Sequence, residues 1–120
     1  MTNTIILILT AHWLADFVSQ NSWMAENKHS DLKALHSHVS FYTFVLFLVL
    51  ANPLSNFDIR QLIYFVLLNA VLHAFVDFFT SKISHRFWID KDYRMFFIAI
   101  GFDQLLHQIC LINTAGIFLQ

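Results

Sequence analysis

The sequence predicts an all-α, polytopic membrane protein with four transmembrane helices. Of its 120 residues 58% are hydrophobic and 12% are charged, whereas about 25% of an average soluble domain is charged. There are 14 phenylalanines but only 2 glycines and 1 proline, which argues against disordered, collagen-like and loop-rich β structures. A soluble domain this small could not bury so much apolar surface. We therefore expect residues 1–120 to form one membrane domain.

Polar connections divide the chain into four apolar segments. They cover residues 4–20, 32–51, 59–84 and 93–119. Each segment is close to the roughly 20 residues that cross a bilayer as a helix. Strands are excluded because four crossings cannot close a barrel, and open sheet edges are not tolerated in lipid.

The connections contain residues that end or begin helices. Residues 21–31 are polar and charged, and residues 85–92 mix aromatic and charged side chains. Pro53 lies in the short second connection and cannot continue a helix. Asp31 and Asp58 stand where the N-caps of the second and third helices are expected.

The basic residues predict the orientation. Six of the seven flank the first and third connections, namely Lys28, Lys33, Lys82, Arg86, Lys91 and Arg94. By the positive-inside rule these two connections are cytoplasmic, so both termini and the second connection face outward. The start of the chain lacks the basic region of a secretory signal, so we expect the first segment to be retained. The net charge of −1 gives no basic signature for a nucleic-acid partner.

A short motif recurs in the apolar segments. The spacing H-x3-D occurs twice and its reverse once, at His12 and Asp16, at His73 and Asp77, and at Asp103 and His107. Residues four apart share one face of a helix. The two forward copies are followed by phenylalanine and suggest two related hairpins about a pseudo-two-fold axis, an arrangement found in transporters.

The periodicity of a helix places the two histidines of the second segment on different faces. His36, Ser40 and Thr43 form one stripe, and His38 lies about 160° away from His36 at 100° per residue. The sequence therefore predicts that His36 faces the other polar residues. His38 is expected to face the interface or another subunit.

Together the segments carry an unusual set of ionisable groups. A charged residue within the bilayer costs about 2.5–3.5 kcal/mol on insertion scales. Counted along each helix at about 1.5 Å of rise per residue, these groups fall in or near the cytoplasmic half of the bilayer. We expect one functional site to be formed by His12, Asp16, His36, His73, Asp77, Asp103 and His107.

The composition of this set favours a divalent metal. Imidazole and carboxylate suit zinc, manganese or iron, with zinc as the first candidate. A bound metal would lower the pKa of its water and support hydrolysis of a lipid-associated or small polar substrate. All seven residues are candidate metal ligands, and all except His36 are candidate catalytic residues. No Lys or Arg is expected at that depth. Gln20, Lys28 and Gln104 are expected to orient the substrate near the cytoplasmic mouth.

Two other functions fit the same residues. Asp and His chains in membranes relay protons or bind solutes, so the protein could be a transporter or a proton-coupled channel. Four helices are too few for a roomy conduit, and this alternative requires a homodimer or larger assembly. The polar groups could also join helices in a structural interaction protein.

The stretch from Ala11 to Lys28 resembles the signature of a family of small bacterial and phage membrane proteins of unknown function. The shared pattern comprises H-x3-D-F-x2-Q, a downstream lysine, paired histidines in the second helix, H-x3-D in the third and D-Q-x2-H in the fourth. The resemblance implies a helical inner-membrane protein and no particular activity. A more distant likeness is to membrane-bound metal-dependent hydrolases, although their longer D-x-D-H and H-R-x-x-T-H-S-like segments are missing.

Overall fold

A computed structural model describes residues 2–119, and this part of the chain consists of helices joined by short connections, without strands. The predicted all-α class is confirmed. In chain order the elements are α1 (Thr2–Trp13), the π-helix η1 (Leu14–Val18), α2 (Ser22–Asn27), α3 (Leu32–Leu50), the 3₁₀ turn η2 (Pro53–Ser55), α4 (Ile59–Ile89) and α5 (Tyr93–Phe118).

Short polar side chains begin the helices. Asp31 accepts a hydrogen bond from the backbone of Lys33, and Asp58 accepts from Arg60 and Gln61. Each bond satisfies a backbone N–H that has no partner within its helix. Both predicted N-caps are therefore confirmed.

Three helices are long and apolar enough to span a membrane, namely α3, α4 and α5. The apolar helix of the first segment covers only Asn3–Val18 and stops short of the roughly 20 residues that a span requires. The chain leaves helical geometry after Val18, and Asn21 caps the separate helix α2. Of the four predicted spans, three are therefore supported by length and composition.

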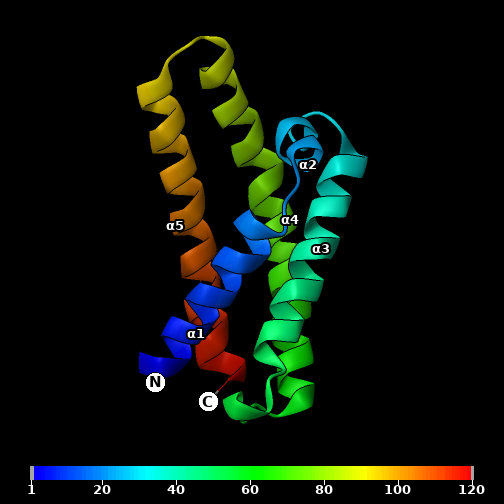
Figure 1. Cartoon of the computed structure of the whole chain (residues 1–120). Helices are drawn as coiled ribbons and strands as arrows, with labels where there is room; N and C mark the ends of the chain where they lie inside the picture. Colours follow the sequence, from blue (N-terminus) through cyan, green and yellow to red (C-terminus); the bar gives the residue numbers. More distant parts are fainter. Residues whose placement is uncertain (1, 120) are drawn as a thin grey trace.

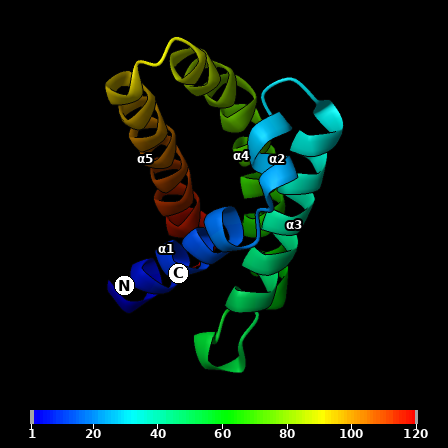
Figure 2. The same ribbon diagram turned by 45° about the horizontal axis from the view of Figure 1, so that its top comes forward.

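The long helices alternate in direction. Figure 1 shows both termini at the end of the molecule that holds η2, while α2 and the α4–α5 connection lie at the opposite end. Figure 2 shows α1 crossing obliquely between α5 and α3, with α4 behind. The alternation agrees with the predicted topology of the connections, and which side faces the cytoplasm stays a prediction.

The distribution of polarity is unlike that of a soluble bundle. Large apolar side chains point outward along the long helices, for example Phe44, Val71 and Phe97, which are 60–67% exposed. An apolar core occupies the η2 end and includes Ile8, Leu46, Leu50, Leu62, Phe65 and Leu111. Next to it, histidines and aspartates fill the interior. Polar groups inside and apolar groups outside are what a bundle in lipid requires.

Candidate metal centre

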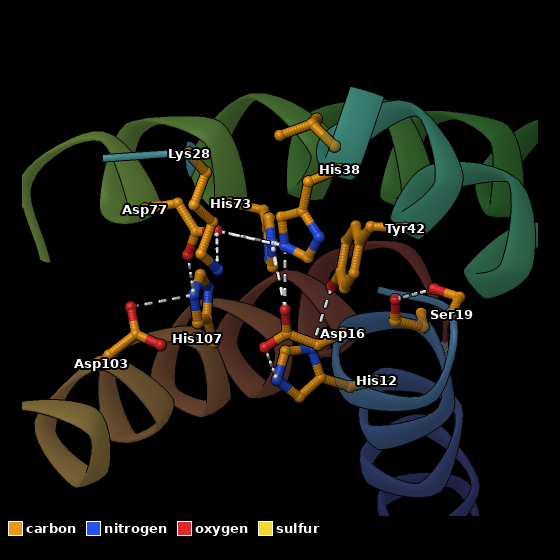
Figure 3. Close-up of polar contacts among 12 residues, drawn as sticks. His12, Asp16, Ser19, Lys28, His38, Tyr42, His73, Asp77, Asp103 and His107 are labelled. Carbon is orange, nitrogen blue, oxygen red and sulfur yellow. Dashed lines mark hydrogen bonds and ion pairs between the residues drawn. The ribbon is translucent and has the colours of Figure 1, made fainter. Parts of the chain in front are cut away.

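Buried ionisable residues converge in the middle of the bundle from α1, η1, α3, α4 and α5 (Figure 3). Their exposed fractions are 8% or lower, and they are His12, Asp16, His38, His73, Asp77, Asp103 and His107. Six of these seven were expected from the sequence. The structure thus brings together residues that are up to about 90 positions apart in the chain.

Four ligand atoms surround one point. We call Asp16, His38, His73 and Asp77 the tetrad, and their nearest ligand atoms all lie within 4.8 Å of one another. His38 Nε2 is 3.0 Å from His73 Nε2 and 3.1 Å from Asp16 Oδ1. It is 3.2 Å from Asp77 Oδ2. His73 Nε2 is 3.5 Å from both of these carboxylate oxygens.

These spacings match a tetrahedral zinc site. Zinc binds nitrogen and oxygen at about 2.0–2.2 Å, so the edges of its ligand tetrahedron measure about 3.3–3.6 Å. Five of the six edges of the tetrad have lengths of 3.0–3.5 Å. Three of these edges are shorter than those of the ideal tetrahedron, so the four atoms could hold one ion after moving slightly apart.

Hydrogen bonds alone do not explain this convergence. A neutral imidazole nitrogen carries at most one proton, and His38 Nε2 lies 3.0–3.2 Å from a ring nitrogen of His73 and from carboxylate oxygens of Asp16 and Asp77. One N–H can point at only one of them. A cation at the centre satisfies all the facing atoms together.

Ring stacking holds His73 in place, and the His38 ring lies against it at a tilt of 45°. The His73 ring stacks on Tyr42 at 3.8 Å and on His107 at 4.2 Å between centroids. The Nδ1 atoms of His38 and His73 are buried and have no hydrogen-bond partner within residues 2–119. Packing thus fixes the rings with Nε2 toward the centre.

Lys28 reaches the tetrad from the α2–α3 connection. Its Nζ lies 2.9 Å from Asp77 Oδ2, and its side chain is only 17% exposed. Burial by itself would lower the pKa of Lys28, but the carboxylates of Asp77 and Asp16 outweigh it and raise that pKa. The expectation that no basic residue lies at the depth of the cluster is therefore wrong. The sequence predicted Lys28 at the cytoplasmic mouth of the site because the connection that carries it was expected to stay outside the bundle.

A second group of candidate ligands shares Asp16 with the tetrad. It consists of Asp16, Asp103 and His107. The Gln104 side chain lies between its two carboxylates and donates to Asp16 Oδ2 at 2.9 Å and to Asp103 Oδ2 at 3.0 Å. Because a donor already bridges these oxygens, an ion could enter the second group only if Gln104 moved away.

His12 lies next to the tetrad without belonging to either ligand group. Its Nδ1 is 3.2 Å from the Tyr42 hydroxyl, and its Nε2 is 3.1 Å from Gln104 Oε1. The Nε2 atom is 3.7 Å from Asp16 Oδ2. His12 therefore contacts a candidate ligand and its neighbours.

The structure reverses the predicted roles of His36 and His38. His36 is exposed on the outside of α3, while His38 is fully buried in the tetrad. The polar stripe was misleading because Ser40 and Thr43 donate to backbone carbonyls one turn earlier in their own helix. Hydroxyl groups satisfied in this way do not need the bundle interior. His36 is thus removed from the candidate ligands.

Sequence reasoning also missed Tyr42. It is 1% exposed, contacts His12 and stacks on His73. The available signal was the stripe of His38, Tyr42 and Leu46 at intervals of four residues, which is the buried face of α3.

The remaining predicted residues lie around a cavity of about 540 Å³ beside the tetrad. Gln20, Lys28 and Gln104 all line it, together with Asp16 and Asp103. Their expected position next to a substrate is compatible with this placement.

A family profile described as "Protein of unknown function (DUF3307)" matches residues 4–120. The chain belongs to the DUF3307 family. No curated protein and no solved structure matches it, so nothing outside the sequence supports the likeness to metal-dependent hydrolases. Membership of DUF3307 fits the resemblance to a family of unknown function and leaves the activity to be argued from the site.

Proposed function

We propose that this DUF3307 protein is an integral membrane protein that binds one divalent metal ion in the tetrad, with zinc as the best-fitting ion. The observation that carries the proposal is the set of five distances of 3.0–3.5 Å between two imidazole nitrogens and two carboxylate oxygens. Two nitrogen and two oxygen ligands suit zinc, with manganese and iron as further candidates.

Charge balance supports a single divalent ion. The buried carboxylates of Asp16, Asp77 and Asp103 bring three negative charges, and Lys28 offsets one of them. With neutral histidines, two negative charges remain in a medium of low dielectric constant. Such charges are costly unless they are paired, and one divalent cation neutralises them.

The proposal also includes insertion of the protein in a membrane. The outward apolar surface and the three long helices support insertion. The first apolar helix would be the fourth segment of the bundle, with the repeated motifs on two related hairpins. Following the positive-inside rule, both termini face the periplasm and the protein resides in the inner membrane.

Hydrolysis is the chemistry that we assign to the ion. A divalent ion lowers the pKa of a bound water and so generates a nucleophile near neutral pH. With all four tetrad residues as ligands, a water would join the ion as a fifth ligand, which zinc can accept during a reaction. His107 contacts Asp77 of the tetrad, and Asp103 contacts His107 in turn. These two residues are the groups that would accept and return protons.

The test is the metal content of purified protein. The protein is expressed with zinc, purified in detergent without chelator, and analysed by elemental mass spectrometry. We expect about one zinc per chain, and loss of most of it in the His38→Ala variant. His36→Ala is a matched control, because this histidine is on the same helix but exposed. Absence of metal from the wild type, or equal metal content in both variants, would overturn the proposal.

Proton-coupled transport is the second candidate, because the buried groups form a continuous polar network. His12 contacts Gln104, Gln104 donates to Asp16, and Asp16 faces the tetrad histidines. Asp77 then contacts His107 at 3.1 Å. In this alternative, protonated histidines replace the ion and a homodimer forms the conduit. Metal-free protein that conducts protons in liposomes and loses the flux with Asp77→Asn would favour it.

A further inference from the structure

The helix α5 is the least buried of the three candidate membrane spans. Only 11% of an apolar 18-residue stretch of α5 is buried, against 28% in α3 and 39% in α4. The helix packs mainly against α4, with a smaller contact to α1, and Figure 1 shows it at one edge of the bundle. A large part of its surface is therefore open to lipid or to another protein.

One exposed face of α5 has the spacing of a helix–helix interface. It consists of Ile98, Gly101, Leu105, Gln108 and Ile112, which are all exposed and which we call the seam. Successive members are alternately three and four residues apart, and this 3.5-residue repeat is the one along which two helices pack side by side. At 100° per residue the five residues fall within an arc of about 80°. The seam thus has the form of one half of a helix pair.

The seam contains a glycine that the packing of the bundle does not require. A Cβ atom at Gly101 would meet nothing within 4 Å, so no neighbour within residues 2–119 comes close to its backbone. Glycine inside a helix lowers the stability of that helix. In membranes, however, small residues let the backbones of two helices approach closely. Gly101 therefore fits the approach of a helix from outside the bundle.

Gln108 places a polar side chain on this outward face. It lies 15 residues after Tyr93, where α5 begins, and 10 residues before Phe118, where α5 ends, or about 22 Å and 15 Å along the helix. When such a helix is centred on a hydrocarbon core about 30 Å thick, Gln108 lies well inside that core.

The amide of Gln108 has no partner in its own bundle. Its side chain makes no hydrogen bond within residues 2–119. The exposed amide of Asn113, in contrast, donates to the Ile109 carbonyl of the same helix at 2.7 Å. An unpaired amide in an apolar medium is costly, and lipid chains offer neither donor nor acceptor. Gln108 is therefore best satisfied by a polar group that another protein brings to the seam.

We propose that two copies of the protein pair through the α5 seam, with the two Gln108 side chains facing each other across a two-fold axis along the membrane normal. Such an axis brings the same residue of both copies together and keeps their orientation in the membrane equal. An amide has both donors and an acceptor, so two Gln108 side chains form two reciprocal hydrogen bonds. The inference rests on the membrane insertion contained in the proposed function, and not on the metal.

The test measures Förster energy transfer between donor-labelled and acceptor-labelled copies in phosphatidylcholine vesicles at increasing protein-to-lipid ratios. We expect a dimer that dissociates on dilution with lipid. Gln108→Leu should raise the ratio at half-association by about fivefold or more, because it removes both hydrogen bonds. Asn113→Leu is the matched control, since it also removes an exposed amide from α5 but lies off the seam. A wild type that stays monomeric, or equal association of Gln108→Leu and the wild type, would overturn the proposal.

Cysteine cross-linking in membranes locates the interface. In a Cys110→Ser background, Leu105→Cys puts a thiol on the seam, and Asn113→Cys puts one about 80° away around the helix. Mild oxidation should give a disulfide-linked dimer with Leu105→Cys and little with Asn113→Cys. Faster cross-linking through Asn113→Cys would contradict the seam as the interface.

Extraction of the membranes with alkaline carbonate separates this inference from the proposed function. Monomeric protein that stays in the washed membrane overturns the pairing of α5 alone. Protein that carbonate releases overturns membrane insertion, and with it both proposals. The zinc content of the wild type bears only on the proposed metal site.

Discussion

The two copies of H-x3-D-F have the same spacing and different outcomes. In the copy on α4, both His73 and Asp77 are tetrad members. In the first copy, only Asp16 enters the tetrad, and His12 turns to Tyr42 and Gln104. The spacing therefore identifies both copies as part of one site without fixing which atoms meet at its centre.

The backbone explains this difference. The α4 copy lies within a regular helix of 31 residues, so its two side chains are stacked one turn apart on one face. The first copy begins in α1 and ends in the π-helix η1, and Asp16 belongs to that π-helical turn. A π-helical turn shifts the phase of the following residues and often marks functional sites.

The largest effect on zinc content is expected when the histidine of each copy is replaced in turn. His73→Ala removes a tetrad ligand and should abolish stoichiometric zinc binding. His12→Ala removes a neighbour of Asp16 and should leave at least half of the zinc bound. Elemental analysis of the two purified variants checks this. Equal losses would mean that the copies are equivalent.

The two aspartates should differ in their contribution to stability. Asp77→Asn leaves the buried ammonium of Lys28 without its carboxylate, which should destabilise the metal-free protein by about 3 kcal/mol. Asp16→Asn should cost less, because its carboxylate is not in contact with Lys28. Thermal unfolding in detergent measures both.

The double variant Lys28→Met with Asp77→Asn is the control for this comparison. Since it removes both partners, it should recover most of the stability lost in the single variant. No recovery would contradict the importance of the ion pair.

Tyr42→Phe tests whether the Tyr42 hydroxyl holds His12, the histidine of the first copy, in place. It deletes the hydroxyl that contacts His12 at 3.2 Å and keeps the ring that stacks on His73. We expect a loss of about 1 kcal/mol in stability and little change in zinc content. Loss of the zinc would instead show that the orientation of His12 controls the tetrad.

The smallest effect concerns a histidine pair that belongs to neither copy. The rings of His29 and His85 stack at 3.5 Å, and burial together with His85 lowers the pKa of His29. A lowered pKa means that the folded protein favours the neutral ring. Its contribution to stability is therefore present above about pH 6.5 and is lost as the pH falls below it.

Thermal unfolding between pH 7.5 and 5 should show a small drop in unfolding temperature that His29→Gln reduces. An identical pH profile in the variant would exclude this pair as its source.

The sequence predicted the helices well because their signals are local. Hydrophobic length, Pro53 and the capping aspartates are visible in short windows, and the bounds of α3 and α5 agree within one residue. The first segment was predicted less well. Its π-helical turn packs against α3, where Asp16 meets His38, and no short window of the sequence records that contact.

The candidate site was predicted in composition and less well in arrangement. Six of the seven buried groups follow from the motif, because ionisable residues in apolar segments are rare and conspicuous. His38 and Lys28 required tertiary information. The burial of His38 follows from the packing of α3 through Tyr42 and Leu46, and that of Lys28 from the fold of the α2–α3 connection.

The origin of the four tetrad ligands has a mechanical consequence. They come from η1, α3 and α4, and none comes from α5. A bound ion would therefore act as a cross-link that closes a chain loop of about 60 residues and restrains the first three segments against one another. The helix α5 lies outside that cross-link while forming one wall of the cavity. It is nevertheless joined to two of the ligands, because Gln104 donates to Asp16 and His107 contacts Asp77, so a bound ion would also restrain α5 indirectly.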